Sequence, residues 1–102
     1  MGSRRERIEQ MLTEDPSDLF LRYSLALELE KEGEHERSLE LLRGLMANET
    51  PYVPAFFMAG QQLARLDRLE EVREVVTSGI EQAQQQGEDH AAREMTEFLA
   101  NL

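Results

Sequence analysis

The pattern of apolar and polar residues is helical along the whole chain. Leu25, Ala26 and Leu29, for example, fall in one sector when each residue advances by about 100°, as it does in an α-helix. No run of β-branched residues has the length and turn punctuation of a strand. The pattern therefore predicts an all-α fold of six helices, at residues 3–13, 17–32, 35–48, 52–66, 69–86 and 88–101.

Local signals indicate where several of these helices begin. Ser3 and Glu6 have the spacing of a capping box, in which each side chain accepts a backbone N–H of the other residue. Asp15-Pro16 and Thr50-Pro51 each have the sequence of an N-cap followed by proline in the first turn. These signals predict three of the helix starts.

The chain also repeats itself with a period of 34 residues. Gly33 aligns with Asp67, and both residue types tolerate the left-handed conformation that ends a helix. Gly87 is predicted to end a later helix in the same way. Residues of like size align at the same offset: Leu25 with Ala59, Ala26 with Gly60, Leu29 with Leu63, Leu42 with Val76, and Met46 with Ile80.

A helix–turn–helix unit of this length resembles the tetratricopeptide repeat family. The small residue where two helices meet is Ala26 and then Gly60, and the large apolar residue three positions on is Leu29 and then Leu63. Other positions follow the family loosely, namely Ser38 and Val72, Leu42 and Val76, and Pro16 and Pro51. Two positions of the first unit depart from the family. Arg22 stands at the tryptophan-like position, which is Phe56 in the second unit, and Leu45 stands at the small position late in the second helix, which is Gly79 in the second unit.

The resemblance implies a right-handed α-α superhelix of antiparallel helix pairs in one domain, residues 1–102. Two complete units are predicted at 19–52 and 53–86. A half-repeat helix at 3–13 precedes them, and a capping helix at 88–101 follows them. Since about three repeats are needed for a stable stack, the flanking helices are predicted to close its two ends.

The first helix of the first unit has two apolar sectors that lie nearly opposite each other. One holds Leu25, Ala26 and Leu29, and the other holds Phe20, Tyr23 and Leu27. A helix of this kind lies between two layers or presents one face outward.

The same division separates the adjacent phenylalanines of the second unit. Phe56 shares its sector with Ala59, Gly60 and Leu63, and is predicted to hold the fold. Phe57 falls in the other sector, with Pro54, Gln61 and Ala64, and is predicted to meet a partner.

In the family that the chain resembles, the second sector lines a concave surface that often receives peptides. The resemblance implies a partner-binding face made of Phe20, Tyr23, Leu27, Lys31, Phe57, Gln61 and Arg65, which Ala91 and Met95 extend. Two alternatives stay open: the face is exposed or covered by a partner, or the last helix folds across it and buries the aromatic residues.

One mode of binding known in the family is disfavoured. Some members hold the terminal carboxylate of a peptide with lysines and asparagines at fixed inner positions. The corresponding residues here are Tyr23, Leu27 and Met58, which cannot form such a clamp.

Composition narrows the classes of partner. The net charge is −10, from 21 acidic and 11 basic residues, and it repels phosphate backbones. Arg4, Arg5 and Arg7 form the one candidate basic cluster, and Glu6 interrupts it. We therefore expect no nucleic acid partner. No run of about 18 apolar residues is present, so no membrane span is expected either.

Candidate chemistry is sparse. The chain has no cysteine, which excludes disulfides and is compatible with a reducing cytoplasm. His35 and His90 lack the spacing of a metal site, and no glycine-rich loop or nucleophile elbow is present. We expect no enzyme activity, no metal and no cofactor. Gly79, next to Ser78 within a helix, is predicted to be a point of close packing.

Two functions remain. The first is a non-catalytic module that binds a protein or peptide through its apolar, aromatic concave face. The second is a self-associating structural protein, in which this face or an end helix forms a homodimer.

Overall fold

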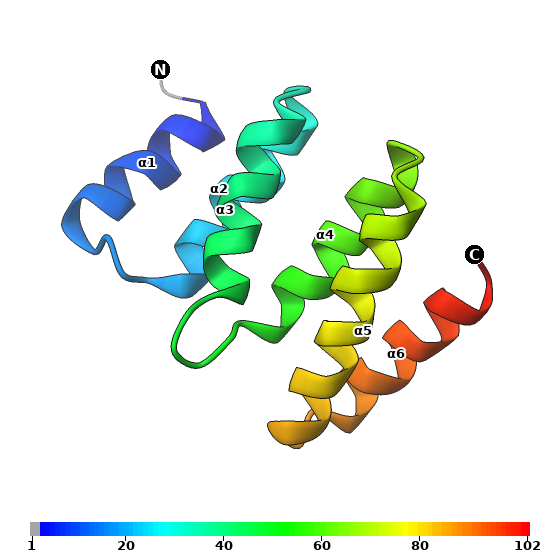
Figure 1. Ribbon diagram of the computed structural model, residues 1–102. Helices are drawn as coiled ribbons and strands as arrows, with labels where there is room; N and C mark the ends of the chain where they lie inside the picture. The colour runs from blue at the N-terminus through cyan, green and yellow to red at the C-terminus, as the bar shows by residue number, and fades with distance from the viewer. Residues whose placement is uncertain (1–2) are drawn as a thin grey trace.

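A computed structural model describes residues 3–102, so residues 1 and 2 of the predicted domain lie outside the described part. Within it the chain forms six α-helices and no strand, which confirms the all-α prediction. The helices are α1 (Arg4–Glu14), α2 (Leu19–Lys31), α3 (His35–Met46), α4 (Val53–Arg65), α5 (Leu69–Gln85) and α6 (Asp89–Ala100). They follow one another in chain order, with α2 behind α3 and the termini at opposite ends in Figure 1, and the molecule measures 43 × 29 × 19 Å. Each helix packs mainly on its neighbours in the chain.

Three helix starts test the capping predictions. Ser3 caps α1 as predicted, because its hydroxyl accepts the backbone N–H of Glu6 at 3.1 Å. The other two predictions were wrong. Asp18, not Asp15, caps α2 by accepting the N–H of Leu21 at 2.9 Å. α4 begins after Tyr52, so its early proline is Pro54.

The turn inside each helix pair repeats at an offset of 34 residues. Gly33 and Asp67 both have left-handed backbones, with φ of 81° and 59°. The N–H of Glu34 donates to the carbonyl of Leu29 at 2.9 Å, and the N–H of Arg68 donates to that of Leu63 at the same distance. This is the Schellman closure of a helix end, and it confirms the predicted alignment of Gly33 with Asp67.

An ion pair occupies the same place after both turns, with its charges exchanged. Arg37 donates to Glu34 at 2.9 Å, and Arg68 donates to Glu71 at 2.5 Å. Arg68 also reaches Glu36 of α3 at 2.7 Å, so it links the two helix pairs.

The core of the second pair depends on glycines that admit large neighbours. Phe56 is buried, and a Cβ added at Gly79 would lie 2.5 Å from the Phe56 Cβ and 2.8 Å from the Met95 sulfur. Gly60 admits Val76 in the same way. The predictions of Phe56 as a packing residue and of Gly79 as a point of close approach are confirmed.

The core of the first pair includes a buried polar chain. The Ser38 hydroxyl donates to the carbonyl of Ala26 at 2.6 Å, and the Gln62 amide donates to the Ser38 hydroxyl at 3.1 Å. Both side chains are almost fully buried. These bonds join α2, α3 and α4, while the buried side-chain oxygen of Gln62 has no hydrogen-bond partner among the described residues.

Candidate functional site

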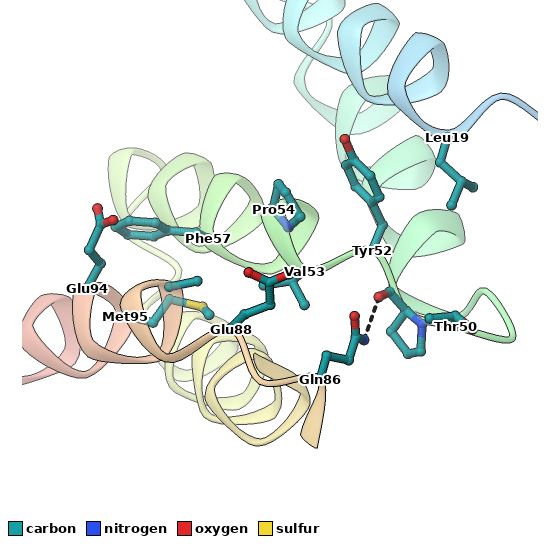
Figure 2. Close-up of a pocket in the computed structure, with 12 residues that line it drawn as sticks. Leu19, Thr50, Tyr52, Val53, Pro54, Phe57, Gln86, Glu88, Glu94 and Met95 are labelled. Atoms are coloured by element: carbon teal, nitrogen blue, oxygen red, sulfur yellow. Dashed lines mark hydrogen bonds between the residues drawn. The ribbon is translucent and has the colours of Figure 1, made fainter. Parts of the chain in front are cut away.

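A groove of about 520 Å³ opens between the start of α2, the start of α4 and the first half of α6. Its walls are mainly apolar. They are formed by Leu19, Thr50, Pro51, Tyr52, Val53, Pro54, Phe57, Gln86, Glu88, Ala91, Glu94 and Met95, hereafter the α4–α6 groove. Figure 2 draws Leu19 and Tyr52 at one end of this set, and Phe57, Glu94 and Met95 at the other.

The loop before α4 shapes one wall of the groove. Tyr52 has an extended backbone and precedes the helix, while Pro54 fits its first turn because proline needs no N–H partner there. The side-chain amide of Gln86 donates to the carbonyl of Pro51 at 2.9 Å (Figure 2) and so ties this loop to the end of α5. The loop is thus held by Gln86 on one side and by the start of α4 on the other, and it forms a defined wall of the groove.

The last helix covers part of Phe57 and leaves the rest in the groove. The rings of Phe57 and Phe98 meet edge to face, with centroids 5.5 Å apart and planes at 71°. Phe57 is nevertheless only half-buried. At Phe57 the last helix therefore covers one side of the ring, and the groove leaves another side exposed.

A second aromatic pair supports the opposite end. The rings of Tyr23 and Tyr52 have centroids 5.5 Å apart and planes at 57°. Burial raises the pKa of Tyr23, and the neighbouring Tyr52 raises it further. Burial also raises the pKa of Tyr52, to which the charge of Asp18 adds. Both hydroxyls therefore stay neutral at physiological pH.

The charged residues of the α4–α6 groove are all acidic. Glu88, the N-cap residue of α6, and Glu94 on α6 line it, and no lysine, arginine or histidine does so among the residues described. Nε2 of His90 lies 2.6 Å from the Glu94 carboxylate, one turn along α6. Glu88 forms no ion pair within residues 3–102.

The structure places the predicted site residues on more than one surface. Phe57 lines the α4–α6 groove, and Tyr23 lies behind Tyr52. Phe20 instead lines a separate depression with Met11 and five other residues of α1 and α2. Phe20 and Met11 are 64% and 51% exposed, the largest values among the exposed large apolar side chains described.

The remaining predicted residues do not line the groove. Arg65 reaches Glu30 at 2.5 Å and joins the ends of α4 and α2, while Lys31 pairs with Glu28 at 3.5 Å. Leu27 and Gln61 are half-buried. Ala91 and Met95, expected as an extension of the face, do line the groove.

Sequence reasoning missed the contributions of Leu19, Tyr52 and Glu88. Tyr52 was expected to lie inside a helix, where its ring would have followed the helical pattern. A signal was present, because a helix starting at Pro51 would place Pro54 beyond its first turn, where proline is not tolerated, so the helix had to begin after Pro51.

The site offers little for catalysis. No group of three or more histidine, cysteine, aspartate or glutamate residues is placed to hold a metal ion in the described part of the chain. Both groove carboxylates, Glu88 and Glu94, are exposed. None of the helices at residues 3–102 has the length and apolar character needed to cross a bilayer.

Similar folds occur among solved structures. The chain is 30% identical to a tetratricopeptide repeat domain protein from Salinibacter ruber; the two align over 84% of this chain and 87% of that one, with a TM-score of 0.79. It is 25% identical to a protein from Bordetella parapertussis, over 99% of this chain and 88% of that one, with a TM-score of 0.81. No model of a protein family matches the chain, and no curated protein is similar to it.

Proposed function

The chain belongs to the tetratricopeptide repeat family, and on that premise we propose that it binds a peptide segment of another protein in the α4–α6 groove. The fold of this family generally mediates protein–protein interaction and is typically non-catalytic. In this proposal, residues 19–52 and 53–86 are the two complete repeats, with α1 and α6 as caps.

The observation that carries the proposal is the groove beside Phe57. It is apolar, about 520 Å³ in volume, and open to solvent on a face where Phe57 is only half-buried. Pockets that hold small ligands have volumes of roughly 300–1,000 Å³. The groove thus has room for a few side chains of a peptide, and buried aromatic contacts supply much of the energy at such sites. Tyr23 takes part by supporting Tyr52.

Selection from a displayed peptide library, followed by affinity measurement on purified protein, tests this function. Peptides that bind should lose affinity about thirtyfold with Phe57→Ala, because a hot-spot aromatic contributes about 2 kcal/mol. Ala91→Phe, which fills the groove without removing a contact, should abolish binding. Circular dichroism must show that both variants keep their helices.

Phe20→Ala is the matched control, since Phe20 is an exposed aromatic outside the groove. Its affinity should equal that of the wild type. Loss of binding with Phe20→Ala, together with unchanged binding by Ala91→Phe, would place the site at the other depression.

A specific observation also favours the second function, self-association. Phe20 and Met11 expose apolar surface side by side at the α1 end of the stack, and such patches mark interaction sites. A homodimer through this end would show a concentration-dependent mass of about twice 11.8 kDa in sedimentation equilibrium, which Phe20→Asp would abolish. A monomer at high concentration would exclude it.

A further inference from the structure

The α4–α6 groove combines apolar walls with charge of one sign. Glu88 and Glu94 stand at its α6 side, and both are exposed. Two acidic groups therefore line a cavity that has no basic side chain in its lining among the residues described.

Most basic residues of the protein are engaged outside the groove. Seven of the eleven form ion pairs with carboxylates outside the groove lining: Arg4, Arg5, Lys31, Arg37, Arg43, Arg65 and Arg68. Glu88 has no basic partner among the described residues and Glu94 has only His90, so both groove carboxylates are available to a cation of a bound partner.

From this arrangement we propose that the occupant of the groove is a cationic amphipathic peptide segment, in which lysine or arginine flanks a large apolar side chain. The inference rests on the proposed function of the groove and adds the chemistry of its partner. The apolar side chain packs against Tyr52, Phe57 and Met95, and the flanking cations meet the carboxylates of Glu88 and Glu94.

Two physical effects favour this partner over a neutral or acidic one. The net charge of −10 attracts cations at long range and speeds their encounter. At contact, an acidic segment would place like charges against Glu88 and Glu94, which costs affinity because the groove offers no compensating cation.

The probes for the test are three synthetic peptides of equal length. The first contains leucine, phenylalanine and lysine. The second replaces each lysine by glutamate, and the third keeps the lysines and replaces the apolar residues by serine. Fluorescence anisotropy at low salt should show the first peptide binding at least about tenfold more tightly than the other two, and added salt should narrow its advantage over the second.

Variants of the protein then test whether the carboxylates of Glu88 and Glu94 are the ones that contact the lysines of the peptide. The double variant Glu88→Gln/Glu94→Gln should weaken the first peptide by about fivefold or more, in line with exposed ion pairs of up to about 1 kcal/mol each. Its matched control is Glu81→Gln/Glu97→Gln, which removes two exposed carboxylates outside the groove lining and changes the net charge equally. The control should change affinity by less than about twofold.

The outcomes separate the two proposals. Equal affinity for the lysine and glutamate peptides, with binding still blocked by Ala91→Phe, overturns the cationic partner and keeps the groove as a binding site. An equal loss in both double variants also overturns it, because the attraction is then one of overall charge. Failure of all three peptides to bind overturns the cationic partner, and the library selection then decides separately whether the groove binds a peptide. Dimerisation that fills the groove with a second copy overturns both proposals.

Discussion

The helix pairs α2–α3 and α4–α5 share one backbone plan and fill it with different side chains. Position 22 is arginine where position 56 is the buried Phe56, and position 45 is the buried Leu45 where position 79 is glycine. The bulk that α3 supplies in the first pair thus comes from α4 in the second, where Gly79 makes room for Phe56. Both pairs therefore share the turn geometry, but the large side chain lies on the second helix of the first pair and on the first helix of the second pair.

The largest difference between the pairs should appear at positions 22 and 56. Phe56→Ala removes a buried ring and should lower the free energy of unfolding by about 3–5 kcal/mol. Arg22→Ala should change it by no more than about 0.5 kcal/mol, as expected for a residue outside the core. Urea denaturation of both variants measures this contrast, and comparable losses would show that the pairs rely equally on this position.

Substitution of one glycine in each helix pair should change the stability in opposite directions. Gly79→Ala places a Cβ against the Phe56 Cβ and should destabilise the protein by up to about 3 kcal/mol through overpacking. Gly44→Ala on α3 is the control, because its Cβ would meet only the movable end of Arg22, at 3.2 Å. That control should stabilise the protein by about 0.5–1 kcal/mol, as alanine does inside a helix. Thermal unfolding distinguishes the two signs.

Variants of the buried hydrogen-bonded pair Ser38 and Gln62 should lower the free energy of unfolding by less, and their effects should not be additive. Ser38→Ala leaves the buried Gln62 amide without its acceptor and should cost about 1–2 kcal/mol. Ser38→Ala/Gln62→Met replaces both partners by apolar groups and should recover most of that loss. Additive losses in the double-mutant cycle would mean that the two side chains stabilise the fold independently.

The smallest effect concerns the exchanged ion pair. The hydrogen bond from Arg68 holds the pKa of Glu71 below its ordinary range. A depressed folded pKa contributes stability above the unfolded pKa, near 4, and this stability is lost as the pH falls through the folded value. In Arg68→Ala the pKa of Glu71 should rise toward its ordinary range, as NMR titration of the carboxyl carbon would show. Arg73→Ala, an exposed arginine outside the ion pairs described, should leave it unchanged.

The sequence predicted the features that depend on neighbouring residues. The six helices, the left-handed turns at Gly33 and Asp67, and the close approach at Gly79 all follow from local spacing and side-chain size. The start of α2 was misplaced because Asp15 and Asp18 are both capable N-caps near one proline. In the structure Asp15 ends α1 as its C-cap residue, so Asp18 caps α2.

The binding face was less predictable, because a helical sector shows direction but not what lies opposite. Phe20 and Tyr23 share a sector, yet Phe20 lies beside α1 and Tyr23 beside Tyr52. The position of α6 was equally hidden, and it determines both the partial cover over Phe57 and the acidic side of the groove. These features arise from contacts between helices, which no single helical pattern contains.

The packing of each helix mainly on its chain neighbours has a consequence for the order in which the molecule forms and opens. Contacts between adjacent segments close only short loops, so folding should take microseconds to milliseconds rather than seconds. α1 packs mainly on α2, so it can detach while the other five helices stay together. Amide hydrogen exchange should therefore be fastest in α1 and slowest in α4 and α5. Unfolding should begin at the N-terminal end, with α1 opening before the other helices.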